Sequence, residues 1–261
     1  MSNLEALLLG ILQGLTEFLP VSSSGHLEIA NHLLGINAES NLAFSTAVHA
    51  GTVLSTLVVF RREIFDIICS VFKFKKTPET ELFIKLLVSA VPVLFVGLFL
   101  KDEVESLFGG SLLIVGLMLI LTAILLTVSH YAPRRERDVS PLSAFVIGIG
   151  QALAVMPGLS RSGTTISTGL MMGVKREKVA AFSFLMVIIP IVGATFLEVI
   201  DGDFGSGEGA LSWSSVAIGF FSAFLSGLVA CRAMIRFVSK GHLLWFALYC
   251  FVLGIITIFV V

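Results

Sequence analysis

The stretch from Gly10 to His26, GILQGLTEFLPVSSSGH, decides the fold expected for this chain. It begins as an apolar helix, but Gln13 and Glu17 interrupt the apolar run one helical turn apart and so lie on one face. Pro20 disfavours a continued helix because it lacks an N–H and crowds the preceding turn. Polar, broken backbone of this kind is tolerated at membrane depth only when it is buried in protein or lines a wet cavity. An ionisable side chain inside such a segment predicts a functional site.

A second stretch, Gly148 to Gly163 (GIGQALAVMPGLSRSG), aligns with the first without a gap when the numbering is shifted by 138. The prolines, Pro20 and Pro157, miss register by one place. The alignment predicts an internal duplication in which a broken, polar element opens each half. The identical positions are Gly10/Gly148, Ile11/Ile149, Gln13/Gln151, Leu15/Leu153, Ser22/Ser160, Ser24/Ser162 and Gly25/Gly163.

The composition is that of an integral membrane protein. Of the 261 residues, 56% are hydrophobic and 13% are charged, and the mean hydropathy is +0.99. A soluble domain carries about 25% charged residues. The apolar runs are too long for barrel strands, so the spans are expected to be helices. Cys69, Cys231 and Cys250 lack metal-ligand spacing. The net charge of −1 by itself carries no information about nucleic acid, and the partner expected is a membrane lipid, not nucleic acid.

The sequence therefore predicts an all-α integral membrane protein with an inverted-topology repeat, two re-entrant helix hairpins and six transmembrane spans. Each half has three crossings, and an odd number turns the second half upside down relative to the first. The first repeat, 1–132, contains a hairpin at about 3–34 and spans at about 43–60, 82–100 and 111–130; a linker covers 133–140; and the second repeat, 141–261, contains a hairpin at about 141–173 and spans at about 178–200, 213–236 and 242–261.

The distribution of Lys and Arg predicts the orientation. These residues cluster at 61–62, 73–76, 85, 134–137, 175–178 and 232–240, all on one side of the expected path, with a basic connection at 61–80. That side is expected to be the cytoplasm. Only Lys101 and Arg161 of the 17 basic residues fall elsewhere. We expect a multi-pass protein of the plasma membrane with both termini outside.

The two hairpins are expected to meet near the midplane, where helix N-termini offer a seat for an anion. Arg161 adds a forked cation suited to phosphate oxygens. Together with it, Glu17, Ser23 and His26 indicate a phosphoryl-transfer site. In that site Ser23 attacks phosphorus and Glu17 or His26 moves the proton. Alternatively, Glu17 and Gln13 hold a divalent cation through oxygen ligands.

Simpler interpretations remain open at this stage. The serines at the breaks are also typical helix caps. Glu17 and Arg161 could form an internal ion pair that only holds the hairpins together. His49 and His242 are interpreted as structural side chains.

The run Gln13-x-x-x-Glu17-Phe18-Leu19-Pro20-Val21-Ser22-Ser23-Ser24-Gly25-His26, with Pro157-Gly158-Leu159-Ser160-Arg161-Ser162-Gly163, resembles the two signatures of the undecaprenyl-diphosphate phosphatase family of the bacitracin-resistance type. The resemblance covers nearly the whole chain. It implies hydrolysis of the lipid-carried diphosphate to the monophosphate and phosphate, which recycles the carrier for cell-wall polymers such as peptidoglycan. It also implies dependence on a divalent cation (Mg²⁺ or Ca²⁺) and a site open to the outer face.

The resemblance assigns roles to individual residues. Glu17, Ser23, His26 and Arg161 are expected to be catalytic. Gln13 stands where many members of the family have a second Glu, so its role as a metal ligand beside Glu17 is in question. Substrate binding is expected at Ser22, Ser24, Gly25, Ser160, Ser162, Gly163 and Thr165.

A transporter is the competing class, because inverted repeats with broken helices also build transporters. A flippase for a polyprenyl phosphate would bind its lipid through Arg161 without needing a nucleophile. Phosphate release in detergent separates the two classes. The lipid chain length, the choice between Ser23 and water as nucleophile, and a homodimeric state stay open.

Overall fold

The computed structural model describes residues 1–36, 42–73, 76–100, 103–104, 111–133, 135–193 and 212–260. The predicted acidic loop at 201–208, the basic residues Lys101 and Arg134, and the last part of the predicted span 178–200 lie outside these ranges.

Within these ranges the fold is all-helical, apart from one isolated bridge between Arg137 and Val174. This confirms the predicted all-α class. The helices are α1 (Asn3–Phe18), α2 (Ser23–Leu34), α3 (Leu42–Val59), α4 (Arg61–Phe72), α5 (Pro78–Phe99), α7 (Leu112–Tyr131), α8 (Pro141–Leu153), α9 (Arg161–Met171), α10 (Arg176–Met186), α12 (Trp213–Lys240) and α13 (Leu243–Val260).

Three of the described helices, α5, α7 and α12, are long and apolar enough to cross a bilayer. Apolar segments of α3, α8 and α13 are shorter. The chain is thus an integral membrane protein, while the count of six spans stays a prediction.

Each of the two polar stretches folds as helix, break and helix, with α1–α2 around the first break and α8–α9 around the second. The first break follows from local chemistry. Leu19 adopts an extended conformation (φ −69°, ψ 142°), as expected for a residue that precedes proline.

The connection at 61–80 differs from expectation, because most of it is helical. Residues Arg61–Phe72 form α4, which is amphipathic: Ile67 is buried, while Arg62 and Asp66 are exposed. The helix signal in the sequence was the spacing of its apolar residues, Ile64, Ile67, Ile68 and Val71, which recur at i, i+3, i+4 and i+7.

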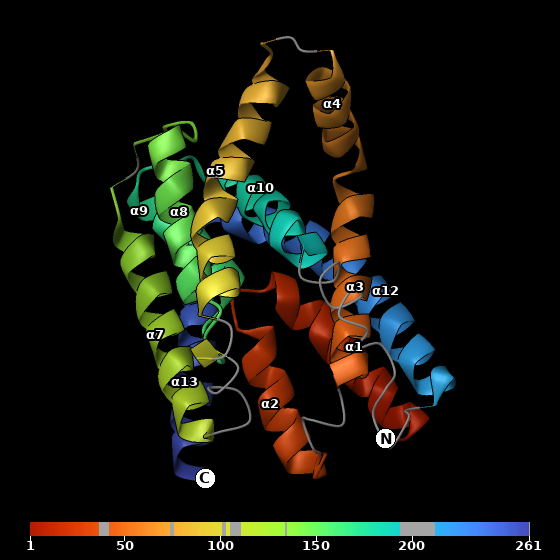
Figure 1. Ribbon diagram of the computed structural model, residues 1–261. Helices are drawn as coiled ribbons and strands as arrows, with labels where there is room; N and C mark the ends of the chain where they lie inside the picture. Colours follow the sequence, from red (N-terminus) through yellow and green to blue (C-terminus); the bar gives the residue numbers. More distant parts are fainter. Residues whose placement is uncertain are drawn as a thin grey trace.

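The helices of the two halves of the chain pack against each other. Helix α1 packs on α12 from the second half, and α8 packs on α5 from the first half, while α7 and α13 pair with each other. Contact between α1 and α12 is close because Gly10 and Gly14 lie directly against the backbone of α12. A Cβ at Gly14 would sit 2.4 Å from the carbonyl oxygen of Ala223. Figure 1 shows that α1 begins and α13 ends at the same end of the molecule, opposite the α4–α5 connection.

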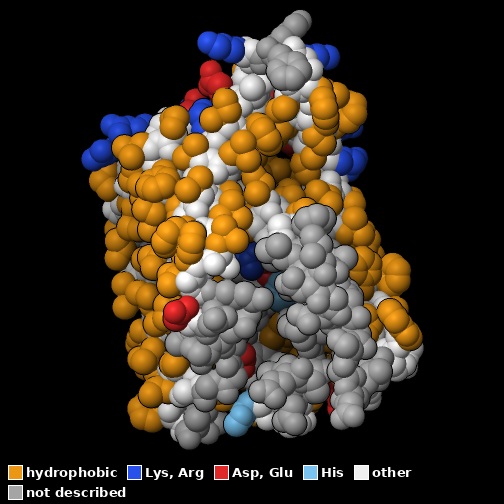
Figure 2. All heavy atoms as spheres, viewed as in Figure 1, with side chains coloured by type: hydrophobic (Ala, Val, Ile, Leu, Met, Phe, Trp, Pro, Cys, Tyr) orange, Lys and Arg blue, Asp and Glu red, His pale blue; other side chains and the backbone are white. Residues whose placement is uncertain are grey.

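Charge is distributed unevenly over the surface seen in Figure 2. Lys and Arg side chains gather at the end where α4 ends and α5 begins, and hydrophobic side chains cover much of the described flanks. Such a surface fits a helical bundle whose flanks face lipid and whose basic end faces water.

Candidate active site

Ser22 organises the first break. It is the N-cap of α2, and its hydroxyl accepts a hydrogen bond from the backbone N–H of Gly25 at 3.1 Å. Its φ of 70° is unusual for a residue with a side chain and stores local strain. Its carbonyl oxygen accepts from Nδ1 of His26 at 2.7 Å, which ties the ring to the first turn of α2.

Ser160 plays the same part in the second break. It is the N-cap of α9, and its hydroxyl accepts from the N–H of Gly163 at 3.1 Å. The two caps and the two glycines are related by the shift of 138 seen in the sequence. Arg161 is the first residue of α9 and therefore projects from the helix N-terminus.

The two breaks touch each other. The Ser162 hydroxyl donates to the carbonyl oxygen of Leu19 at 3.1 Å, and the Gly158 N–H donates to Ser24 Oγ at 3.4 Å. A Cβ added at Gly25 would lie 3.1 Å from the Cα of Gly158, so the backbones of the two breaks approach closely at this point. The structure therefore brings the polar residues of both halves to one place.

The carboxylate of Glu17 is the centre of this cluster, and its side chain is 9% exposed. Oε2 accepts from the Ser23 hydroxyl at 2.6 Å and from Nε2 of Gln13 at 2.9 Å. Nη1 of Arg161 lies 3.7 Å from Oε1, and Nε2 of His49 lies 4.0 Å from Oε2. The short Ser23 contact is a charge-assisted bond, in which a carboxylate is placed to receive the hydroxyl proton.

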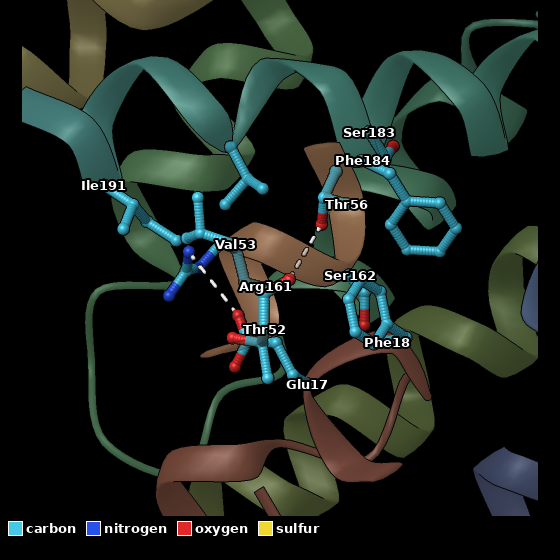
Figure 3. Close-up of a pocket in the computed structure, with 11 residues that line it drawn as sticks. Glu17, Phe18, Thr52, Val53, Thr56, Arg161, Ser162, Ser183, Phe184 and Ile191 are labelled. Atoms are coloured by element: carbon cyan, nitrogen blue, oxygen red, sulfur yellow. Dashed lines mark hydrogen bonds and ion pairs between the residues drawn. The ribbon is translucent and has the colours of Figure 1, made fainter. Parts of the chain in front are cut away.

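A small pocket opens beside this carboxylate, with a volume of about 20 Å³, enough for one water molecule (Figure 3). In Figure 3 the side chains of Glu17 and Arg161 face each other across it. Its other lining residues are apolar or carry hydroxyls: Phe18, Thr52, Val53, Thr56, Ser162, Ser183, Phe184, Val187 and Ile191.

The structure divides the residues singled out from the sequence. Ser23, Gln13 and Arg161 all meet Glu17. The ring of His26 is used differently, because Nδ1 bonds the Ser22 carbonyl and Nε2 bonds the hydroxyl of Tyr249 in α13.

Among the residues expected to bind substrate, several hydroxyls are engaged within their own helices. Those of Ser22 and Ser160 cap helices, and Thr165 Oγ1 donates to the backbone carbonyl of Arg161 at 2.9 Å. Ser162 lines the pocket.

His49 was interpreted as structural, yet it lies beside Glu17. Its Nδ1 bonds the carbonyl oxygen of Ser45 at 2.8 Å, one turn earlier in α3, and this turns Nε2 toward the carboxylate. No motif in the sequence predicts that α3 packs beside α1. The one available signal was the polarity of this face of α3, where Thr52 and Thr56 follow His49 at helical intervals.

The donor set is compatible with a divalent cation of the kind that prefers oxygen. Gln13 Oε1 is buried without a hydrogen-bond partner, and Oε1 of Glu17 faces the pocket beside Arg161. Mg²⁺ usually keeps several waters and needs only one or two carboxylates together with substrate phosphates. No cluster of three or more His, Cys, Asp or Glu occurs in the described part of the chain, so a cage built wholly from such ligands is absent there.

The fold and site define a class of helical membrane proteins in which a hydroxyl, a carboxylate and an arginine meet where two broken helices touch. The chain belongs to the family of the bacitracin resistance protein BacA, whose model matches residues 6–256. It is 54% identical to the undecaprenyl-diphosphatase of Parabacteroides distasonis over 99% of this chain and 98% of that protein. The undecaprenyl-diphosphatase of Bacteroides fragilis is 52% identical over 98% of this chain and 97% of that protein. The undecaprenyl-diphosphatase of Methanobrevibacter smithii is 39% identical over 98% of this chain and 97% of that protein.

Proposed function

We propose that this protein hydrolyses undecaprenyl diphosphate to the monophosphate and inorganic phosphate, and so returns the lipid carrier to cell-wall synthesis. The family membership and the names of relatives that match over nearly the full length support this activity. The observation that carries the chemistry is the 2.6 Å hydrogen bond from the Ser23 hydroxyl to the Glu17 carboxylate. The relatives give no support to the alternative of a flippase.

In the proposed reaction Ser23 is the nucleophile. Its Oγ attacks the terminal phosphorus while its proton passes to Oε2 of Glu17. The bridging P–O bond breaks, and the lipid monophosphate leaves with both electrons of that bond. A water molecule then attacks the phosphoserine, the bond between phosphorus and Ser23 Oγ breaks, and Glu17 returns its proton to Ser23, while both hydrogens of the water leave with the released phosphate. His26 is the second proton carrier near the break.

Arg161 binds the oxygens of the transferred phosphoryl group in this scheme. In the structure its side chain is 32% exposed, and its guanidinium lies 3.7 Å from Glu17 at the closest atoms, which is longer than a hydrogen bond. The fork therefore keeps donors for phosphate oxygens, whose charge it stabilises as the bond to phosphorus forms. Entry of a diphosphate between the two side chains replaces the ion pair with a charge-assisted phosphate contact.

A divalent cation, Mg²⁺ or Ca²⁺, would be held by Glu17 and the free amide oxygen of Gln13, with water and substrate phosphates completing its shell. Such an ion would neutralise charge on the diphosphate.

The inverted repeat and its orientation belong to the same proposal. The matching helix–break–helix elements, their equivalent serine caps and the cross-packing of the halves support the duplication. The basic end of the surface supports a cytoplasmic α4–α5 connection, with both termini outside.

Cysteine labelling tests this orientation in a chain whose three native cysteines are replaced. Leu33→Cys, at the exposed end of α2, should react with an impermeant reagent on whole cells. Phe72→Cys, equally exposed at the end of α4, should react only after permeabilisation. The reverse pattern overturns the orientation.

Trapping tests the nucleophile. The enzyme is quenched during turnover of diphosphate labelled at its terminal phosphorus, and Ser23 is examined for phosphate by mass spectrometry. A phosphoserine at Ser23, absent from Ser23→Ala, is the expected result. Absence of any adduct at Ser23 during steady turnover would instead assign attack to water, because solvent oxygen enters the released phosphate by either route.

A further inference from the structure

Helix α13, at the far end of the chain, reaches the first break through two consecutive residues. Tyr249 places its hydroxyl 2.7 Å from Nε2 of His26, and the two rings lie nearly parallel, 8° apart, with centroids separated by 5.6 Å. The thiol of Cys250 lies 3.5 Å from the carbonyl oxygen of Pro20 and packs with Val21. One turn of α13 therefore contacts both the backbone of the first break, at Pro20, and the imidazole of His26.

The partners of His26 fix its hydrogen-bonding pattern. The Ser22 carbonyl can only accept, so Nδ1 carries the proton in that bond. When the ring is neutral, Nε2 has a lone pair and the Tyr249 hydroxyl donates to it. When the ring is protonated, Nε2 donates and the same hydroxyl oxygen accepts. A hydroxyl serves both roles, so this contact holds the ring in one orientation through a full proton cycle.

We infer that Tyr249 is a positioning residue for His26 in the phosphatase reaction. It fixes the plane of the imidazole during catalysis and, because its hydroxyl occupies Nε2, a proton enters or leaves that nitrogen through this hydrogen bond. The inference rests on the proposed role of His26. The contrast in exposure fits this role, because His26 is 8% exposed while Tyr249 is 46% exposed. The ring that moves the proton is enclosed, and the residue that orients it comes from the helix that closes this side of the break.

The test compares Tyr249→Phe with wild type in phosphate release from undecaprenyl diphosphate. Phenylalanine keeps the ring contact and loses only the hydroxyl. We expect kcat to fall about 10- to 10²-fold, a share of the 10²- to 10⁴-fold that general acid–base catalysis contributes, with KM within about threefold of wild type. Tyr131→Phe is the matched control and should leave activity unchanged. Tyr131 is the other tyrosine of the chain, also contacts a neighbouring histidine ring, that of His130, edge-on, and lies exposed at the end of α7.

Combination with His26→Gln separates positioning from a general structural role. In the His26→Gln background, adding Tyr249→Phe should lower kcat by less than about threefold, because the imidazole that Tyr249 orients is gone. An equal loss in both backgrounds, a kcat within about twofold of wild type for Tyr249→Phe alone, or a loss that follows a lower thermal midpoint in detergent would each overturn the inference. If His26→Gln itself stays within a few-fold of wild type, the proposed role of His26 fails, and the assignment of Tyr249 fails with it. Retained phosphatase activity in that variant would leave the function of the protein standing.

Discussion

Replacement of Gly14 by alanine should reduce catalysis without touching a reacting group. The new Cβ would lie 2.4 Å from the backbone oxygen of Ala223 and 2.0 Å from Oγ of Ser226, whereas an ordinary contact begins at 3.4 Å. The serine can rotate away, but the backbone oxygen cannot, so α1 and α12 must separate locally by about 1 Å. Overpacking of this kind typically costs about 1–3 kcal/mol of stability.

That displacement falls one turn before Glu17, whose carboxylate must meet Ser23 at 2.6 Å. A misplacement of about 1 Å in a catalytic group can cost about 10²-fold in rate. Because the helices absorb part of the shift, we expect kcat to fall about 10- to 10²-fold. Ser226→Ala should restore little of the loss, since the clash with the Ala223 oxygen remains.

Phosphate release in detergent, together with the thermal midpoint of each variant, measures both effects. Gly97→Ala is the matched control, because a Cβ at Gly97 meets nothing within 4 Å and the change also falls inside a helix. It should leave rate and midpoint close to wild type. A Gly14→Ala protein with wild-type kcat and midpoint would refute the close approach of α1 and α12 as the device that places Glu17.

The remaining predictions concern the cluster itself. Arg161→Lys should lower activity by about 10²-fold or more, because an ammonium cannot reproduce the planar fork on two phosphate oxygens; a rate within a few-fold of wild type would make Arg161 a simple point charge. His49→Gln, which keeps a polar nitrogen near Glu17, should stay within about threefold of wild type, whereas His49→Leu should lose about tenfold in kcat, and equal rates for the two variants would remove His49 from the site. Removal of divalent cations by a chelator should abolish activity, and Mg²⁺ should restore it. Gln13→Glu adds a second carboxylate and should lower the Mg²⁺ concentration needed for half-maximal rate. If that concentration is unchanged, residue 13 is not a ligand.

The sequence predicted the elements that depend on local chemistry. Pro20 and the serines marked the first break, and the repeated S-x-S-G pattern marked the second, because caps and helix breakers act through neighbouring residues. The meeting of Glu17 with Arg161 was also expected, since buried charges of opposite sign at two breaks need partners.

Contacts that depend on the packing of distant helices were missed. His49 and Tyr249 each look like an ordinary residue of an apolar helix, and only the placement of α3 and α13 gives them polar partners on the first break. The rotation of one helix against another is set by side-chain packing along its whole length, which no short motif encodes. Ser22 and Ser160 are a local matter instead: their hydroxyls cap helices, which is the simpler interpretation that the sequence left open.

The cross-packing of the halves has a consequence for biosynthesis. Helix α1 ends at Phe18, but its main packing partner, α12, begins only at Trp213, about 195 residues later. At elongation rates of about 5–20 residues per second, the ribosome needs roughly 10 to 40 s to complete that interval. During this time the glycine face of α1 lacks the helix that later packs on it. The nascent first half therefore depends on the insertion machinery or on a holding factor for most of its synthesis, and a chain stalled before α12 should be a preferred substrate for membrane proteases.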